Sequence, residues 1–174
     1  VLENLTHDGS TMPGTAGIGH TRWATHGTPS DVNAHPQFNT ARTIAVVQNG
    51  IIENYIQLKE KLENSGYQFV SETDTEVIAH LLDHYYKKYE KDPMRAIVHS
   101  LQRMEGSYAI AVMFEDQPDE VYAVRKDCPL ICGISDKGSF AASDATALLK
   151  YTRNVYYLDN KVIAKLTKTD GIHF

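Results

Sequence analysis

The middle of the chain alternates apolar and polar residues with the period of an α-helix. Asn54 can cap a first helix, because an asparagine side chain can accept a hydrogen bond from a free backbone N–H. Tyr55, Leu58 and Leu62 then fall on one helical face, and Gly66 ends the pattern. This segment therefore predicts an amphipathic helix that buries one side.

A second helix follows a short extended segment at 67–71. Thr73 and Glu76 have the spacing of a capping box, which makes Asp74 the first helical residue. The apolar residues that recur at helical spacing behind it are Val77, Ile78, Leu81, Leu82, Tyr85 and Tyr89. Pro93 predicts the start of a third, shorter helix. Its inward-facing residues are Ile97, Leu101 and Met104.

From Ser107 onward the hydrophobic period changes to two, which is typical of strands. Segments 107–115 and 120–126 predict a hairpin, and Asp159 and Asn160 predict the turn of a second one. The remaining predicted elements are strands at 16–23, 43–48, 129–135, 139–144, 154–159 and 161–167, and about two turns of helix at 145–151. Most strands are expected to be antiparallel, because their connections are short.

These elements predict an α+β fold. Two mainly antiparallel sheets covered by helices would bury the apolar pattern, whereas a doubly wound parallel sheet would not produce the hairpins. The 174 residues, 42% of them hydrophobic, are enough for one core and too few for two. We therefore expect a single domain over residues 1–174.

Charge and hydropathy exclude two classes of partner. The 22 acidic and 17 basic residues give a net charge of −5, and no run of Lys or Arg is present to neutralise a phosphate backbone. The apolar runs are far shorter than the roughly 20 residues that a bilayer helix needs. We expect a soluble, cytoplasmic protein that binds neither nucleic acid nor membrane.

Residues 19–39 concentrate several of the eight histidines and the one tryptophan of the chain. His20, His26 and His35 are candidate zinc ligands, but no H-E-x-x-H helix or neighbouring cysteine accompanies them. Cys128 and Cys132 are four residues apart, which fits neither a redox pair nor half of a zinc site. We expect no metal, and we expect both cysteines to be buried free thiols.

Three other positions each have a structural and a functional interpretation. Arg22 is either a surface residue at a strand end or a guanidinium that grips a carboxylate. Asn49 and Gly50 form either a hairpin turn or an oxyanion hole. Asp74 either complements the helix dipole or receives an ammonium group. Taken together, the functional interpretations describe an enzyme that holds glutamine and cleaves its side-chain amide.

Four motifs also carry a family resemblance that covers essentially the whole chain. They resemble the glutaminase domain of class II glutamine amidotransferases, and most closely that of the glucosamine-6-phosphate synthases, the isomerising glutamine–fructose-6-phosphate aminotransferases. The motifs are "GIGHTRWATHG", "NAHP", "VQNGIIENY" and "SETDTEVIAHLL". The resemblance implies an N-terminal-nucleophile hydrolase fold, a four-layer α-β-β-α sandwich.

The resemblance also implies roles for individual residues. Arg22 would contact the α-carboxylate of glutamine and Asp74 its α-ammonium, while Asn49 and Gly50 would form the oxyanion hole. His35 would support the pocket from behind. The other residues implied around the pocket are Trp23, Thr25 and His26. No cofactor is expected, and the implied partners are L-glutamine, fructose 6-phosphate through a downstream isomerase domain, and further copies of the whole enzyme in a homo-oligomer.

One feature departs from the family. The family nucleophile is an N-terminal cysteine whose own α-amine acts as the base, whereas residue 1 here is Val1. We therefore expect the catalytic cysteine and its strand to precede Val1, and we expect this chain alone to be inactive. The alternative is a domain without a nucleophile that binds or senses glutamine or another amino acid.

Overall fold

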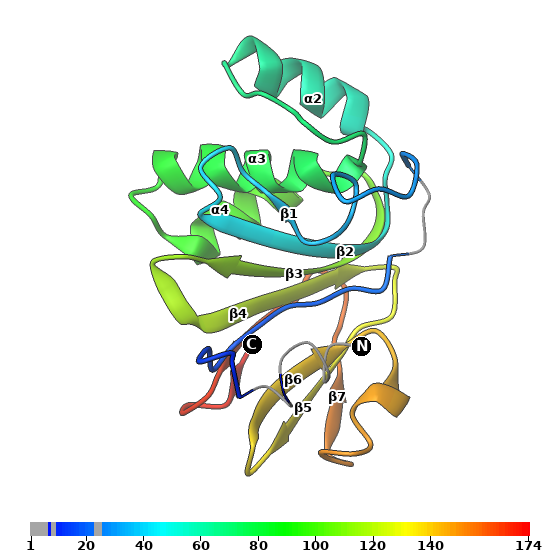
Figure 1. Ribbon diagram of the computed structural model, residues 1–174, viewed down its shortest axis with the longest axis vertical. Coiled ribbons are helices and arrows are strands. Elements are labelled where there is room, and N and C mark those ends of the chain that lie inside the picture. Colours follow the sequence, from blue (N-terminus) through cyan, green and yellow to red (C-terminus); the bar gives the residue numbers. More distant parts are fainter. Residues whose placement is uncertain (1–6, 8–9, 23–25) are drawn as a thin grey trace.

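The computed structural model describes residues 7, 10–22 and 26–174, which form two antiparallel sheets (Figure 1). In this part of the chain the larger sheet has the strand order β1-β2-β3-β4-β8-β9, and the smaller has the order β6-β5-β7. The larger sheet consists of β1 Gln37–Phe38, β2 Ile44–Ile52, β3 Gly106–Phe114, β4 Gln117–Lys126, β8 Ile163–Thr167 and β9 Ile172–His173. The smaller consists of β5 Ile131–Ser135, β6 Gly138–Ala142 and β7 Val155–Tyr157.

Helices cover one face of the larger sheet, and the smaller sheet lies on its other side (Figure 1). Helix α3 (Asp74–Lys88) packs on β2, and α4 (Pro93–Leu101) packs beside it. Helix α2 (Tyr55–Asn64) packs against α3 and lies farther from the sheet. This arrangement confirms the predicted α+β class with antiparallel sheets.

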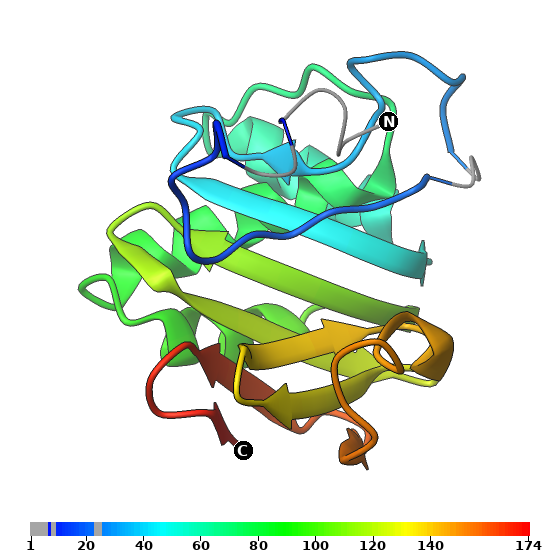
Figure 2. The same ribbon diagram turned by 60° about the horizontal axis from the view of Figure 1, so that its bottom comes forward.

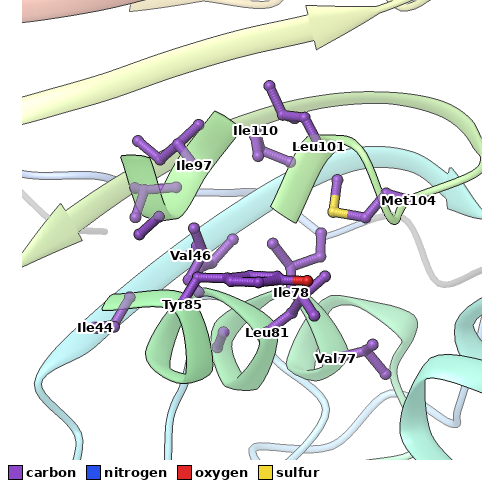
Figure 3. Packing of buried hydrophobic residues seen from close by; sticks show 14 of the residues in the cluster. Ile44, Val46, Val77, Ile78, Leu81, Tyr85, Ile97, Leu101, Met104 and Ile110 are labelled. Atoms are coloured by element: carbon purple, nitrogen blue, oxygen red, sulfur yellow. The ribbon is translucent and has the colours of Figure 1, made fainter. Parts of the chain in front are cut away.

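Strand β3 separates two hydrophobic cores. Its larger side chains, Tyr108, Ile110, Val112 and Phe114, belong to the core between sheet and helices, whereas Ala109 belongs to the core that it shares with β5 and β8. The alternation follows from the pleat of the strand, which sends successive residues to opposite faces. Figure 3 shows Ile110 in the first core, among residues of β2, α3 and α4. Each Leu or Ile that is fully buried there contributes about 1.5–3 kcal/mol.

The three helices start where the sequence predicts, but the cap predicted at Asn54 does not form. Thr73 caps α3, because its hydroxyl accepts a hydrogen bond from the backbone N–H of Glu76. Asp92 caps α4 through the N–H of Arg95, with Pro93 at the first helical position. Asn54 precedes α2, but its side chain makes no cap hydrogen bond and instead bonds the backbone at 103 and 105.

Four local predictions were wrong. Asn49 and Gly50 form no hairpin, because β2 continues through them to Ile52 and pairs along its whole length with β3. The predicted strands at 154–159 and 161–167 do not pair with each other, because β7 joins the smaller sheet and β8 pairs with β4. Residues 145–151 contain one short 3-10 helix, η1 (Ala145–Ala147), instead of two turns of helix. The described part of the predicted strand at 16–23 is not a strand.

The path of the chain before β1 matters for the site. In both views residues 10–22 run beside the larger sheet on the side away from the helices (Figure 2).

The outer side of the smaller sheet has no α-helix among the described residues. Gly133 of β5 is covered there by Leu148 and Thr152, which follow the short helix η1. Across the described chain, no helix combines the length and apolar character needed to span a bilayer.

Candidate functional site

A cavity of about 220 Å³ opens where the end of β2, the start of α3 and the segment before β1 meet. It is smaller than the roughly 300–1,000 Å³ typical of sites for drug-sized ligands, and so suits a small metabolite. The lining residues are His20, Arg22, His26, His35, Gln48, Asn49, Gly50, Thr73, Asp74 and Thr75. The lining therefore carries one guanidinium, one carboxylate and several other polar groups.

Asp74 lies at the first position of α3 and is 4% exposed. Its Oδ2 accepts hydrogen bonds from the backbone N–H of Ile52 at 2.8 Å and from Gln48 Nε2 at 3.2 Å. Its Oδ1 lies 3.9 Å from Nδ1 of His26, which is beyond hydrogen-bond distance. Among the described residues the carboxylate is thus fixed through one oxygen, and the other has no hydrogen-bond partner.

Arg22 holds the loop that forms one wall of the cavity. Its Nη2 donates to the carbonyl oxygens of His26 at 2.5 Å and of Gly27 at 3.0 Å, and its Nη1 donates to that of Thr28 at 3.3 Å. A guanidinium carries five N–H donors, so these bonds leave donors for a carboxylate. The surface interpretation of Arg22 is wrong, because the side chain is half-buried and lines the cavity.

Asn49 and Gly50 form the exposed end of β2 on the opposite wall. Oδ1 of Asn49 accepts a hydrogen bond from Nε2 of His20 at 2.7 Å, which leaves the amide N–H₂ of Asn49 as a donor. Gly50 has φ +100, and a Cβ atom there would lie 2.1 Å from the carbonyl oxygen of Ser107. Only glycine fits at this point, where β2 bends against β3.

His35 is a half-buried residue of the cavity lining. Its ring packs on that of His20 with centroids 4.4 Å apart, and its Nδ1 accepts a hydrogen bond from the backbone N–H of Gln48. Burial, with smaller contributions from the nearby His20 and Arg22, lowers the pKa of His35 from 6.5 to about 4. The ring is therefore neutral at pH 7.

The histidines do not form a metal site. Within residues 10–22 and 26–174, no three or more His, Cys, Asp or Glu side chains converge in a way that could hold a metal ion. His20 bonds Asn49, and His35 bonds the backbone of Gln48, so each uses a ring nitrogen within the protein. The zinc alternative therefore has no support in the geometry.

Neither cysteine belongs to the cavity. Cys132 is fully buried on β5, and this burial raises the pKa of its thiol to about 11. Cys128 is half-buried, and burial is the main cause of its raised pKa. Because the thiolate is the nucleophilic form, both residues are poor nucleophiles at neutral pH. Both thiols are free as predicted, but the prediction that both are buried is wrong for Cys128, which lies between β4 and β5.

Of the site residues predicted from the sequence, the cavity lining contains Arg22, His26, His35, Asp74 and the Asn49–Gly50 pair. Trp23 and Thr25 were also predicted at this site, but they lie outside the described residues. The sequence prediction missed four lining residues: His20 as a partner of Asn49, and Gln48, Thr73 and Thr75. Gln48 and Thr75 are each adjacent in sequence to a predicted site residue, and that adjacency was the available signal.

Known proteins match the chain over almost its whole length. The sequence profile of the glutamine amidotransferase domain matches residues 20–150. The glutamine–fructose-6-phosphate aminotransferase (isomerizing) of Clostridium acetobutylicum is 51% identical over 173 residues, which are 99% of this chain and 28% of that protein. Its counterpart in Caldanaerobacter subterraneus is 55% identical over 94% of this chain and 26% of that protein. The chain thus spans about a quarter of the length of these curated relatives.

Solved structures agree with the sequence matches. The glutamine phosphoribosylpyrophosphate amidotransferase of B. subtilis superposes with a TM-score of 0.69 and 27% identity, over 88% of this chain and 33% of that chain. A structure described as the allosteric regulatory enzyme of purine biosynthesis has a TM-score of 0.72 and 28% identity, over the same shares. On the strength of the profile match, which covers most of its residues, this chain belongs to the glutamine amidotransferase domain family.

Proposed function

We propose that the cavity binds L-glutamine as the glutaminase site of a glutamine–fructose-6-phosphate aminotransferase. The observation that carries the proposal is one cavity lined by both the guanidinium of Arg22 and the carboxylate of Asp74. An amino acid at neutral pH carries a carboxylate and an ammonium group, so its two charges match this pair. His26 forms part of the wall between them, and Trp23 and Thr25 complete the pocket in this proposal.

Asn49 and Gly50 would then act on the side-chain amide of the bound glutamine. A thiolate that attacks the amide carbon turns the carbonyl oxygen into an oxyanion, which the Nδ2 donor of Asn49 and the backbone N–H of Gly50 stabilise. Collapse of this intermediate, with transfer to the nitrogen of the proton that the base took from the thiol, releases ammonia and leaves a thioester. Water then hydrolyses the thioester to glutamate and restores the thiol. The bond between His20 and Asn49 supports this role, since it occupies Oδ1 and leaves Nδ2 to donate.

The attacking thiol in this proposal is a cysteine outside the 174 residues. Neither Cys128 nor Cys132 lines the cavity, and burial raises the pKa of both thiols. The family resemblance implies an N-terminal cysteine whose α-amine serves as the base, together with an N-terminal-nucleophile hydrolase fold of four layers. Residues 1–174 would then form a single glutaminase domain.

The remaining activity belongs to the whole protein. We propose that the ammonia reaches an isomerase domain that binds fructose 6-phosphate and forms glucosamine 6-phosphate, and that the whole enzyme is a cytoplasmic homo-oligomer. The support is the sequence identity of 51% and 55% to two glutamine–fructose-6-phosphate aminotransferases. The proposed reaction requires no cofactor.

The test uses the full-length product of the gene. We expect glutamate to form from glutamine and glucosamine 6-phosphate to appear when fructose 6-phosphate is added, both followed by mass spectrometry. If glutamate forms but no amino sugar appears, the aminotransferase assignment is contradicted, and only the glutaminase activity remains supported. Glutamine binding without hydrolysis would support the alternative, a domain that binds or senses the amino acid.

A further inference from the structure

We propose that His35, Thr75 and Gln48 form a directed hydrogen-bond chain that positions Asp74 for the substrate ammonium group. This series of hydrogen bonds holds Oδ2 of Asp74 and leaves Oδ1 open to the cavity. The inference deepens the proposed function, on which it rests, by assigning a positioning role to three residues that need not touch the substrate. It makes recognition of the α-ammonium group depend on the buried hydroxyl group of Thr75.

The direction of every bond follows from the donors and acceptors available. The backbone N–H of Gln48 can only donate, so Nδ1 of His35 is an acceptor and the proton of the neutral ring is on Nε2. That Nε2–H then donates to the hydroxyl oxygen of Thr75 at 3.1 Å. The hydroxyl of Thr75 in turn donates to Oε1 of Gln48 at 2.6 Å. With its oxygen fixed in this way, the amide of Gln48 must direct its nitrogen at Asp74.

Burial makes this arrangement stable. Gln48 is 4% exposed and Thr75 1%, so water cannot replace a missing partner without a substantial cost. The charges around His35 act in the same direction, because the nearby His20 and Arg22 oppose a second proton on its ring. A doubly protonated ring would present an N–H to the N–H of Gln48 and break the first link.

The two oxygens of Asp74 consequently differ. Oδ2 receives two donors, from Gln48 and from the backbone of Ile52. In the described part of the chain Oδ1 faces Nδ1 of His26, which is 3.9 Å away. Because Asp74 is also held in the first turn of α3, the free oxygen keeps one direction, toward the cavity. An ammonium group that meets it needs no rearrangement of the site.

A matched pair of variants at Thr75 tests the chain of bonds. Thr75→Val removes the hydroxyl at nearly constant volume, and Thr75→Ser keeps the hydroxyl and removes the methyl group. The measurement is calorimetric titration of the full-length gene product with L-glutamate and with glutarate. Glutarate has both carboxylates of glutamate but lacks the α-ammonium group, so the ratio of the two dissociation constants isolates the contact with Asp74.

We expect Thr75→Val to weaken glutamate binding by about fivefold to thirtyfold, the cost of a misaligned charge-assisted hydrogen bond, with glutarate almost unchanged. Thr75→Ser should retain the wild-type preference for glutamate. If Thr75→Val does not fold, Gln48→Met provides the same comparison, since it removes the amide that donates to Asp74. A purely structural role predicts equal weakening for both ligands.

Two results overturn the inference while the proposed function stands. One is an unchanged preference for glutamate in Thr75→Val and Gln48→Met, and the other is an equal loss for both ligands. A wild-type protein that binds glutamate no better than glutarate overturns the ammonium contact itself, and with it this inference. That failure appears in the wild type alone, so the two cases are distinguishable.

Discussion

At the scale of the residue, the site depends on positions where one atom decides the fit. Gly50 is such a position, because a Cβ there would lie 2.1 Å from the carbonyl oxygen of Ser107. Gly66 provides the matched control. Its φ of +91 is also positive, but a Cβ added there would meet no atom within 4 Å.

We expect Gly50→Ala to lower the free energy of unfolding by roughly 2–4 kcal/mol, through backbone strain and the clash with β3. Gly66→Ala has the strain without the clash and should lose only about 1 kcal/mol. Urea unfolding of both variants measures the difference. Equal losses would show that the close approach of Ser107 has no energetic consequence.

Asp74 provides a residue-scale test of the proposed function. Asp74→Asn keeps the shape but removes the charge that would meet an ammonium group. We expect glutamate to bind about 10- to 100-fold more weakly, the range for a hydrogen bond to a charged group, and glutarate to bind no more weakly than before. The control is Glu63→Gln on the exposed side of α2. A loss in the control as large as in Asp74→Asn would contradict the role of Asp74.

His35 should make the protein less stable in acid. The unfolded chain takes up a proton on this ring as the pH falls through 6.5, whereas the folded protein does so only near its lowered pKa of about 4. Stability from this group is therefore complete above pH 6.5 and is lost progressively down to about pH 4. We expect the loss between about pH 7 and pH 4.5 to be smaller in His35→Gln, measured by urea unfolding. An equal loss of stability in both proteins would contradict the lowered pKa of His35.

At the scale of the element, the start of α3 holds the segment that leads into the site. The carboxylate of Glu76 accepts hydrogen bonds from the backbone N–H groups of Val70 and Ser71 and lies 3.4 Å from His80. Burial opposes the charge, but the nearby His80 and the hydrogen bonds from the Ser71 hydroxyl and from these backbone groups outweigh it and lower the pKa of Glu76. The capping box is thus modified: Thr73 caps the helix, while Glu76 holds the preceding turn.

We expect Glu76→Gln to destabilise the protein by roughly 2–4 kcal/mol, because an uncharged amide replaces a buried acceptor of several hydrogen bonds. The loss should shrink as the pH falls, since the wild-type carboxylate contributes its stability only above its lowered pKa. Unfolding measured across the acid range checks both statements. The exposed Glu63→Gln is again the control, and a pH-independent loss would contradict the second statement.

The elements that were predictable from sequence are those with local signals. Thr73 and Pro93 mark helix starts, and a helix start depends only on neighbouring residues. Asn49 and Asp159 failed as hairpin signals, because a turn motif does not reveal which strand lies alongside. At the site, Asp74 was predictable from its place in the helix. The bonds from Arg22 to the 26–28 loop were not, because they depend on how that loop folds back.

At the scale of the whole molecule, the cavity and the buried thiol of Cys132 lie in different parts of the fold. The cavity lies at the end of β2 and the start of α3, whereas Cys132 lies in the core that the smaller sheet shares with β3 and β8. A pocket with ligand-binding groups and no thiol among its described lining residues agrees with a reaction whose nucleophile comes from elsewhere in the protein. The match to about a quarter of each relative leaves room for such a residue.

This separation predicts the outcome of covalent labelling. A diazoketone or chloroketone analogue of glutamine should leave Cys128 and Cys132 unmodified in the native 174-residue chain, because burial raises the pKa of both thiols and neither lines the cavity. Iodoacetamide in denaturant should modify both, which shows that they are chemically intact. In the full-length gene product the analogue should label a cysteine outside these residues, and Cys128→Ser with Cys132→Ser should leave that labelling unchanged. A stoichiometric adduct on either of the two, mapped by peptide mass spectrometry, would move the nucleophile into this chain and contradict the assignment.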